Sequence, residues 1–196
     1  IWGTSSSWTL TALPLFVWMG EILFRTKLSE NLFKGLSPWL QKMPGGLIHV
    51  NVVGCALFAA ISGSSAATVA TVGKMSIPEL RKRNYPEKIL VGSLAGSGTL
   101  GLLIPPSIIL IIYGVAVQES IAKLFIAGII PGIMIALIFM SYVIIWSLIN
   151  KKEMPVLNEE YSFLEKIKRS RQLLPVIILI SSVIGSIYTG IATATE

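Results

Sequence analysis

Aspartate is absent from this 196-residue chain, and cysteine and histidine occur once each, as Cys55 and His49. A single cysteine cannot form a disulfide within the chain, and a buried, small apolar residue is its commonest role. A serine nucleophile at Ser64 or Ser65 would need a base, and His49 is the only histidine in a chain without aspartate. The chain also has no Gly-x-x-x-x-Gly-Lys-Ser/Thr phosphate loop. The composition therefore disfavours an intramembrane hydrolase and an ATP-driven pump.

Charged residues are scarce as well. They make up 13% of the chain, against about 25% in a soluble domain, and 53% of the residues are hydrophobic. Fifteen of the 16 lysines and arginines fall in three stretches, 25–44, 74–88 and 150–172. Basic loops stay on the cytoplasmic side of a membrane, so the basic charge indicates topology. A nucleic-acid binder is disfavoured, because the segments between these stretches are too apolar.

Residues 8–24 are apolar over about one bilayer thickness and lead into the first basic stretch. We expect them to cross the membrane inward. Residues 27–42 alternate charged and apolar side chains, which favours an amphipathic helix on the cytoplasmic surface. The opening Ile1-Trp2 and the end at Glu196, without a polar tail, lead us to expect a segment of a longer protein.

The apolar block 45–73 has basic residues on both flanks. A single crossing would place one basic flank outside, and each half is shorter than the roughly 20 residues that a crossing needs. We therefore predict a re-entrant hairpin, with arms 46–61 and 66–78 and a turn at 62–65. A continuous helix that tolerates its Gly-Ser residues is the alternative.

A second break lies in the next apolar segment, 89–117, as Gly96-Ser97-Gly98-Thr99-Leu100-Gly101-Leu102-Leu103-Ile104-Pro105-Pro106-Ser107. Its prolines remove two backbone donors, and its glycines weaken the helix before them. Irregular backbone at membrane depth is tolerated where it packs in protein or lines a cavity, and transporters use such breaks to hold ions and anionic substrates. Two neighbouring breaks favour a shared site, although a purely structural kink is the alternative. Beyond them we expect an external turn at 118–123, a span over 124–149, a charged cytoplasmic connection over 150–172 that is partly helical from about Tyr161, and a last span over 173–190.

Several of these residues resemble a known family. Gly63-Ser64-Ser65-Ala66, then Gly98-Thr99-Leu100-Gly101 leading into Ile104-Pro105-Pro106-Ser107, resemble the large membrane subunit of tripartite ATP-independent periplasmic (TRAP) transporters. Further similar stretches are Leu13-Pro14-Leu15-Phe16 with Met19-Gly20-Glu21, Pro44-Gly45-Gly46-Leu47, and Tyr188-Thr189-Gly190 leading to Thr195-Glu196. Many members have proline where this chain has Ala194. The region of His49-Val50-Asn51-Val52 and Cys55 is similar to members of the sialic-acid type.

The resemblance implies an all-α polytopic protein of the bacterial inner membrane, with two inverted repeats and an elevator mechanism. It implies import of an organic acid, such as sialic acid or a C4-dicarboxylate, coupled to Na⁺ and not to ATP. A periplasmic substrate-binding protein and a small membrane (Q) subunit would be its partners. The chain would then divide into a scaffold span with a surface helix (1–44), the hairpin (45–78), a broken helix of the transport domain (79–119), a further transmembrane helix (120–149), the connection (150–172) and the start of the second repeat (173–196).

The two breaks supply the candidate ligands. Sodium prefers oxygen, and glycines allow carbonyls to turn inward, so a site of this kind needs no buried carboxylate. The expected sodium-site residues are Ser62, Gly63, Ser65, Gly96, Gly98, Gly101, Pro105 and Pro106. Half-helices that start near Ser65 and Ser107 would turn their positive ends toward a substrate carboxylate. The hydroxyls expected to contact substrate are those of Ser64, Ser65, Thr68 and Thr99, with ordinary small-residue helix packing as the alternative. A passive channel or a structural membrane subunit is the rival function.

Overall fold

The computed structural model describes residues 12–26, 28–155 and 161–189, and the regular secondary structure in this part of the chain is all helical. Residues 8–11 of the first expected span, and the Gly190 and Thr195-Glu196 part of the family resemblance, lie outside the described residues. The helices are α2 (Ala12–Phe24), α3 (Leu28–Leu40), α4 (His49–Ser62), α5 (Ser65–Lys82), α6 (Glu87–Gly98), α7 (Ile108–Val117), α8 (Ile121–Ile149), α9 (Phe163–Ser170) and α10 (Leu174–Tyr188). Short 3₁₀ turns are η2 (Gly46–Ile48), η3 (Thr99–Leu102), η4 (Lys151–Glu153) and η5 (Arg171–Leu173).

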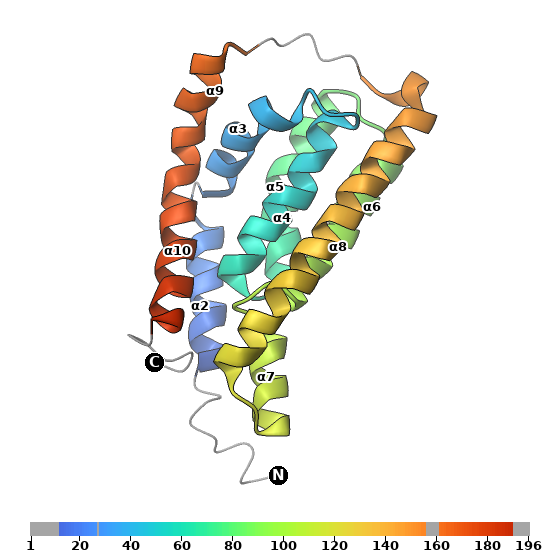
Figure 1. Ribbon diagram of the computed structural model, residues 1–196. Helices are drawn as coiled ribbons and strands as arrows, with labels where there is room; N and C mark the ends of the chain where they lie inside the picture. The colour runs from blue at the N-terminus through green and yellow to red at the C-terminus, as the bar shows by residue number, and fades with distance from the viewer. Residues whose placement is uncertain (1–11, 27, 156–160, 190–196) are drawn as a thin grey trace.

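The centre of the molecule is the antiparallel pair α4 and α5, which lies between α2 and α3 on one side and α6 and α8 on the other (Figure 1). Gly63 and Ser64 separate the two helices, at the turn expected from the sequence. The second arm continues through Pro78 to Lys82. Side chains of α4, α5 and α6 form most of the core, including Phe58, Val72, Leu80, Leu90 and Leu94.

The second apolar segment is broken as well, but over a shorter stretch than its composition suggests. α6 continues to Gly98, η3 adds one tight turn, and the backbone leaves helical geometry only over 103–107 before α7 begins. Gly96, Gly98 and Gly101 do not interrupt this helical stretch, and each lies where another segment approaches closely: Phe139 of α8, Val69 of α5 and the Ser65 backbone. The helical stretch stops shortly before two consecutive prolines, Pro105 and Pro106, neither of which has an N–H to donate, whereas the single Pro78 lies inside α5.

Two helical segments are long and apolar enough to cross a membrane, among the residues that the structure describes: Ile121–Ile149 and Phe163–Ile187. The first is α8. The second runs from α9 through η5 into α10, so the charged stretch before 173 and the apolar stretch after it form one helical column. Large side chains along α8, such as Ile130 and Leu137, are exposed, which suits a lipid or partner-protein environment.

The basic stretches gather at one end of the bundle. In Figure 1, α3, the turn between α5 and α6, and η4 with α9 all lie at the upper end, whereas the turn between α7 and α8 lies at the lower end. The loops at the two ends of the bundle therefore differ in charge as the sequence predicts. The cationic loops lie at one end, and the short turn 118–120 lies at the other.

Candidate functional site

The hairpin tip is built by two residues with different backbone conformations. Gly63 closes α4 in the left-handed region, with φ of +59°, and its N–H donates to the Ala59 carbonyl at 3.0 Å. Ser64 is extended and caps α5, because its hydroxyl accepts a hydrogen bond from the Ala67 N–H at 3.4 Å. Gly63 is favoured here because an L side chain at such a φ is strained. The sequence Gly-Ser therefore ends one helix and starts the next within two residues.

Hydroxyl groups hold the tip together from inside. The Ser62 and Thr68 hydroxyls lie 2.9 Å apart, and the Thr68 hydroxyl donates to the Ser64 carbonyl at 2.7 Å. The Thr68 N–H also donates to that carbonyl, at 3.0 Å. Ser62 and Thr68 are fully buried, so these bonds satisfy polar atoms that water does not reach. The network crosses the turn and fixes the angle between the two arms.

The second break packs directly on this tip. The Ile108 N–H, the first of α7, donates to the Gly63 carbonyl at 3.1 Å. A Cβ atom added at Gly63 would lie 2.7 Å from the Pro106 carbonyl oxygen, and one added at Gly101 would lie 2.8 Å from the Ser65 backbone nitrogen. The carbonyl end of α4 thus meets the N–H end of α7, which pairs the negative and positive ends of two helices. The two breaks share one contact region.

This contact lies within the height of the bundle, beside α8. A Cβ atom at Gly128 of α8 would lie 2.8 Å from the Leu103 carbonyl oxygen, and one at Gly132 would lie 2.9 Å from Ile104. At 1.5 Å per residue, these two glycines are about 10 and 17 Å from the start of a helix roughly 43 Å long. Small residues four apart allow this close approach of backbone to helix. The irregular segment is therefore covered by α8 on one side and by the hairpin tip on the other.

The expected sodium-site residues divide into two groups. Ser62, Gly63, Ser65, Gly98, Gly101 and Pro106 belong to the tip or to the part of the break against it, since Gly98 packs on Val69 of α5 and Gly101 on Ser65. Gly96 faces α8 instead, because a Cβ atom added there would lie 3.2 Å from the Phe139 ring. Pro105 lies near Gly128 of α8.

The four hydroxyls expected to contact substrate also differ in access. Ser64 and Ser65 are half-buried, whereas Thr68 is fully buried and bonded within the tip. Thr99 is exposed, and its hydroxyl donates to the Gly96 carbonyl at 2.7 Å. Within the described part of the chain, the Ser65 hydroxyl takes part in no hydrogen bond. Ser65 is therefore the tip hydroxyl that is reachable and uncommitted.

One polar connection was not identified from the sequence. Buried Asn51 of α4 donates to the Leu90 carbonyl at 3.2 Å and to the Ser93 hydroxyl at 3.0 Å. The Ser97 hydroxyl in turn lies 3.4 Å from the Asn51 carbonyl. Ser93 and Ser97 are four residues apart on one face of α6, and this spacing was the available signal. These bonds tie the hairpin to the helix before the break.

The side-chain and carbonyl groups where the two breaks meet offer oxygen atoms as ligands. Among the described residues, no group of three or more His, Cys, Asp or Glu side chains could hold a metal ion. Backbone carbonyls and serine or threonine hydroxyls line the contact between the breaks. Oxygen ligands of this kind suit a hard cation better than a soft transition metal.

The chain is similar to permeases over its whole length. Residues 1–196 match the family described as "Tripartite ATP-independent periplasmic transporter, DctM component". The C4-dicarboxylate TRAP transporter large permease protein DctM of Pseudomonas aeruginosa is 37% identical over 98% of this chain and 44% of its own length. The isethionate TRAP transporter permease protein DctMQ of Oleidesulfovibrio alaskensis is 35% identical over 97% and 30%, and the sialic acid TRAP transporter large permease protein SiaM of Vibrio cholerae is 34% identical over 99% and 45%.

These relatives are named for three different solutes at almost the same identity, so similarity leaves the substrate type unresolved. The chain spans less than half the length of each of them. The family is one of ATP-independent transporters and not of enzymes. On the match over its whole length, the chain belongs to the DctM component family of TRAP transporter large permeases.

Proposed function

We propose that the protein to which this chain belongs is the large permease subunit of a sodium-coupled secondary transporter that imports organic acids. The acids would be C4-dicarboxylates or sialic acid, delivered by a periplasmic substrate-binding protein, with a small membrane (Q) subunit completing the system. The observation that carries the proposal is the meeting of two helix breaks inside the bundle, where the Ile108 N–H bonds to the Gly63 carbonyl. Family membership supports the assignment.

In the proposed mechanism, sodium binds to oxygens of the contact region. Tip residues Ser62, Gly63 and Ser65 would contribute from one side, and break residues from the other. The N-terminal ends of α5 and α7, which begin at Ser65 and Ile108, would attract the substrate carboxylate through their positive ends. The hairpin and the broken helix would move together as an elevator, which their mutual packing and the Asn51 bonds support.

The proposed location is the bacterial inner membrane, with the basic end of the bundle in the cytoplasm. The clustering of α3, the α5–α6 turn and α9 at one end supports this orientation through the preference of lysine and arginine for the cytoplasmic side. The hairpin then enters from the cytoplasmic side and returns to it.

The first experiment measures uptake of labelled sialic acid, succinate and isethionate into proteoliposomes that contain the full-length permease, its small subunit and its binding protein. Uptake of one acid that requires an inward sodium gradient and proceeds without ATP is expected. Replacing sodium by potassium, or omitting the binding protein, should abolish it. Uptake that ignores sodium, or that needs no binding protein, would point to a channel or to a carrier of another kind.

A second experiment separates a site residue from a packing residue. Ser65→Ala should leave the thermal unfolding temperature unchanged, because its hydroxyl is not bonded within the described chain, and should lower uptake about tenfold or more. Ser141→Ala is the matched control, since Ser141 is an exposed serine of α8 whose hydroxyl bonds only the Leu137 carbonyl of its own helix. Equal uptake by both variants would remove Ser65 from the substrate site.

A further inference from the structure

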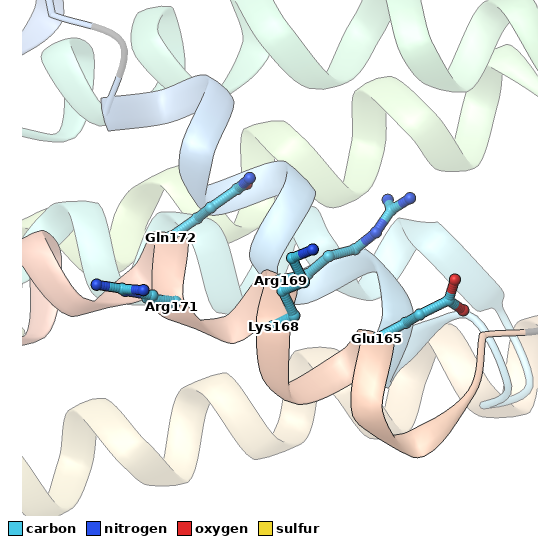
Figure 2. Close-up of a pocket in the computed structure, with 5 residues that line it drawn as sticks. All are labelled: Glu165, Lys168, Arg169, Arg171 and Gln172. Atoms are coloured by element: carbon cyan, nitrogen blue, oxygen red, sulfur yellow. The ribbon is translucent and has the colours of Figure 1, made fainter.

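A dense group of cations lies immediately before the last apolar helix. Lys166, Lys168, Arg169 and Arg171 fall within six residues of α9 and η5, and α10 follows without a break in the helical column. Three of them, with Glu165 and Gln172, line a hollow of about 540 Å³. Figure 2 shows these five side chains along α9 and η5. Lysine and arginine clusters next to a spanning helix attract anionic lipid headgroups.

A second hollow, of about 380 Å³, opens between α3, α5 and α9 and shares Arg169 with the first. Its charged lining consists of Lys34, Lys74, Arg83 and Arg169, with Glu30 and Glu79. Glu30 pairs with Lys34, and Glu79 with Arg83 at 3.9 Å. The four cations exceed the two carboxylates by two charges, so the combined surface favours an anion.

Close packing fixes the helix that carries these cations. A Cβ atom at Gly35 of α3 would lie 2.6 Å from Leu173 and 3.4 Å from the Arg169 carbonyl oxygen, so the two helices touch here. The Trp39 indole N–H donates to the Ser170 hydroxyl at 2.8 Å. The Arg169 guanidinium lies 4.4 Å from the Tyr161 ring centre. The helical backbone that carries the cations, and the Arg169 side chain with it, is therefore held against α3 and Tyr161.

An apolar edge borders the cations. Phe163, Leu164 and Ile167 of α9 are 66%, 76% and 51% exposed, and Phe163 packs edge-on against Trp39 with ring centres 6.4 Å apart. A helix with exposed apolar and basic side chains together is typical of the membrane–water boundary. Its continuity with the spanning α10 places α9 at that boundary.

We propose that this surface between α3 and α9 binds an anionic phospholipid. Its phosphate is held by Lys168 and Arg169 with support from Arg171, and its acyl chains lie against the exposed Leu174 and Ile178 of α10, on the membrane side of these cations. The proposal rests on the membrane placement of the family and is independent of the substrate and of sodium coupling. A protein partner with an acidic surface would need the same cations, but it would not select between lipids.

The test uses the purified full-length permease in non-ionic detergent and native mass spectrometry, with phosphatidylglycerol or phosphatidylcholine added. We expect phosphatidylglycerol to bind at least tenfold more tightly. Each removed cation is expected to weaken that binding about fivefold, so Lys168→Gln with Arg169→Gln should weaken it about 25-fold. Because Arg169 also contacts Tyr161, the pair Lys168→Gln with Arg171→Gln repeats the test without touching that contact.

The matched control is Lys151→Gln with Lys152→Gln, two exposed cations in η4 at the same end but outside both hollows. The control should change binding by less than twofold. Equal binding of the two lipids, or equal losses in control and test pairs, would overturn the proposal. Inorganic phosphate at about 1 mM should not displace the lipid. Displacement would assign the surface to soluble phosphate and would also overturn the proposal.

Discussion

Gly98 offers the sharpest test of how the broken helix packs on the hairpin. It ends α6 with φ of −60° and ψ of −27°, a conformation that alanine adopts without strain. A Cβ atom there would lie 1.9 Å from one Val69 methyl carbon, Cγ2. The next atoms are Val69 Cβ at 3.4 Å and the Ser65 carbonyl oxygen at 3.9 Å. A single methyl group therefore creates the whole clash.

Removing that methyl group should rescue the variant. Gly98→Ala alone is expected to lower the free energy of unfolding by about 1–3 kcal/mol, the usual cost of overpacking. Val69→Ala alone removes two methyl groups from a half-buried side chain and should cost about 1–2 kcal/mol. In the double variant the Cβ of residue 69 is at ordinary contact distance, so the double variant should be no less stable than Val69→Ala. The coupling energy is then about 1–3 kcal/mol.

The assay is unfolding of the full-length permease in mixed micelles, followed by tryptophan fluorescence, for the wild type, both single variants and the double variant. Gly92→Ala is the control in the same helix, because a Cβ atom there meets nothing within 4 Å. It should be neutral or stabilising by up to about 1 kcal/mol, the helix propensity of alanine over glycine. Additive effects of Gly98→Ala and Val69→Ala, or a harmless Gly98→Ala, would refute the packing described here.

Gly101→Ala should lower the free energy of unfolding by about 2 kcal/mol or more and should reduce uptake, because its Cβ would meet the Ser65 backbone and not a movable side chain; rescue by Val69→Ala would contradict this. Tyr85→Phe should cost about 1–3 kcal/mol in the same unfolding assay, since the buried Leu47 N–H loses the hydroxyl to which it donates at 3.0 Å, whereas exposed Tyr113→Phe should be near neutral. Burial raises the pKa of Tyr85, so the neutral form is favoured in the fold; its stabilising contribution is present below about pH 10 and is lost as the pH rises further. Unfolding midpoints measured from pH 8 to about 11 should therefore fall more steeply for the wild type than for Tyr85→Phe, and parallel curves would contradict the assignment.

The hairpin could be predicted because its signals are local. Basic residues on both flanks of a short apolar block, with Gly63-Ser64 at its centre, specify two arms and a turn, and the helices end and begin at those residues. The column from α9 to α10 was less accessible. A helix from about Tyr161 was expected within the charged connection, and the Ser162–Glu165 capping box starts α9 at Phe163. The charges did not indicate that this helix continues through η5 into the last span, as it does in the structure. Charge content alone does not end a helix when caps and spacing favour one.

The contact between the two breaks could not be predicted from glycine content alone, but helical geometry would have indicated which glycines face the hairpin. Glycine content treats Gly96, Gly98 and Gly101 as equivalent weak points of one helix. Helical geometry does not, because residues three apart share a face whereas residues two apart lie on nearly opposite faces. Gly98 and Gly101 accordingly pack on Val69 and Ser65 of the hairpin, and Gly96 packs on Phe139 of α8. Gly96→Ala should therefore loosen the contact with α8 and spare the tip, so the tip-facing pair is the better place to seek the proposed ion.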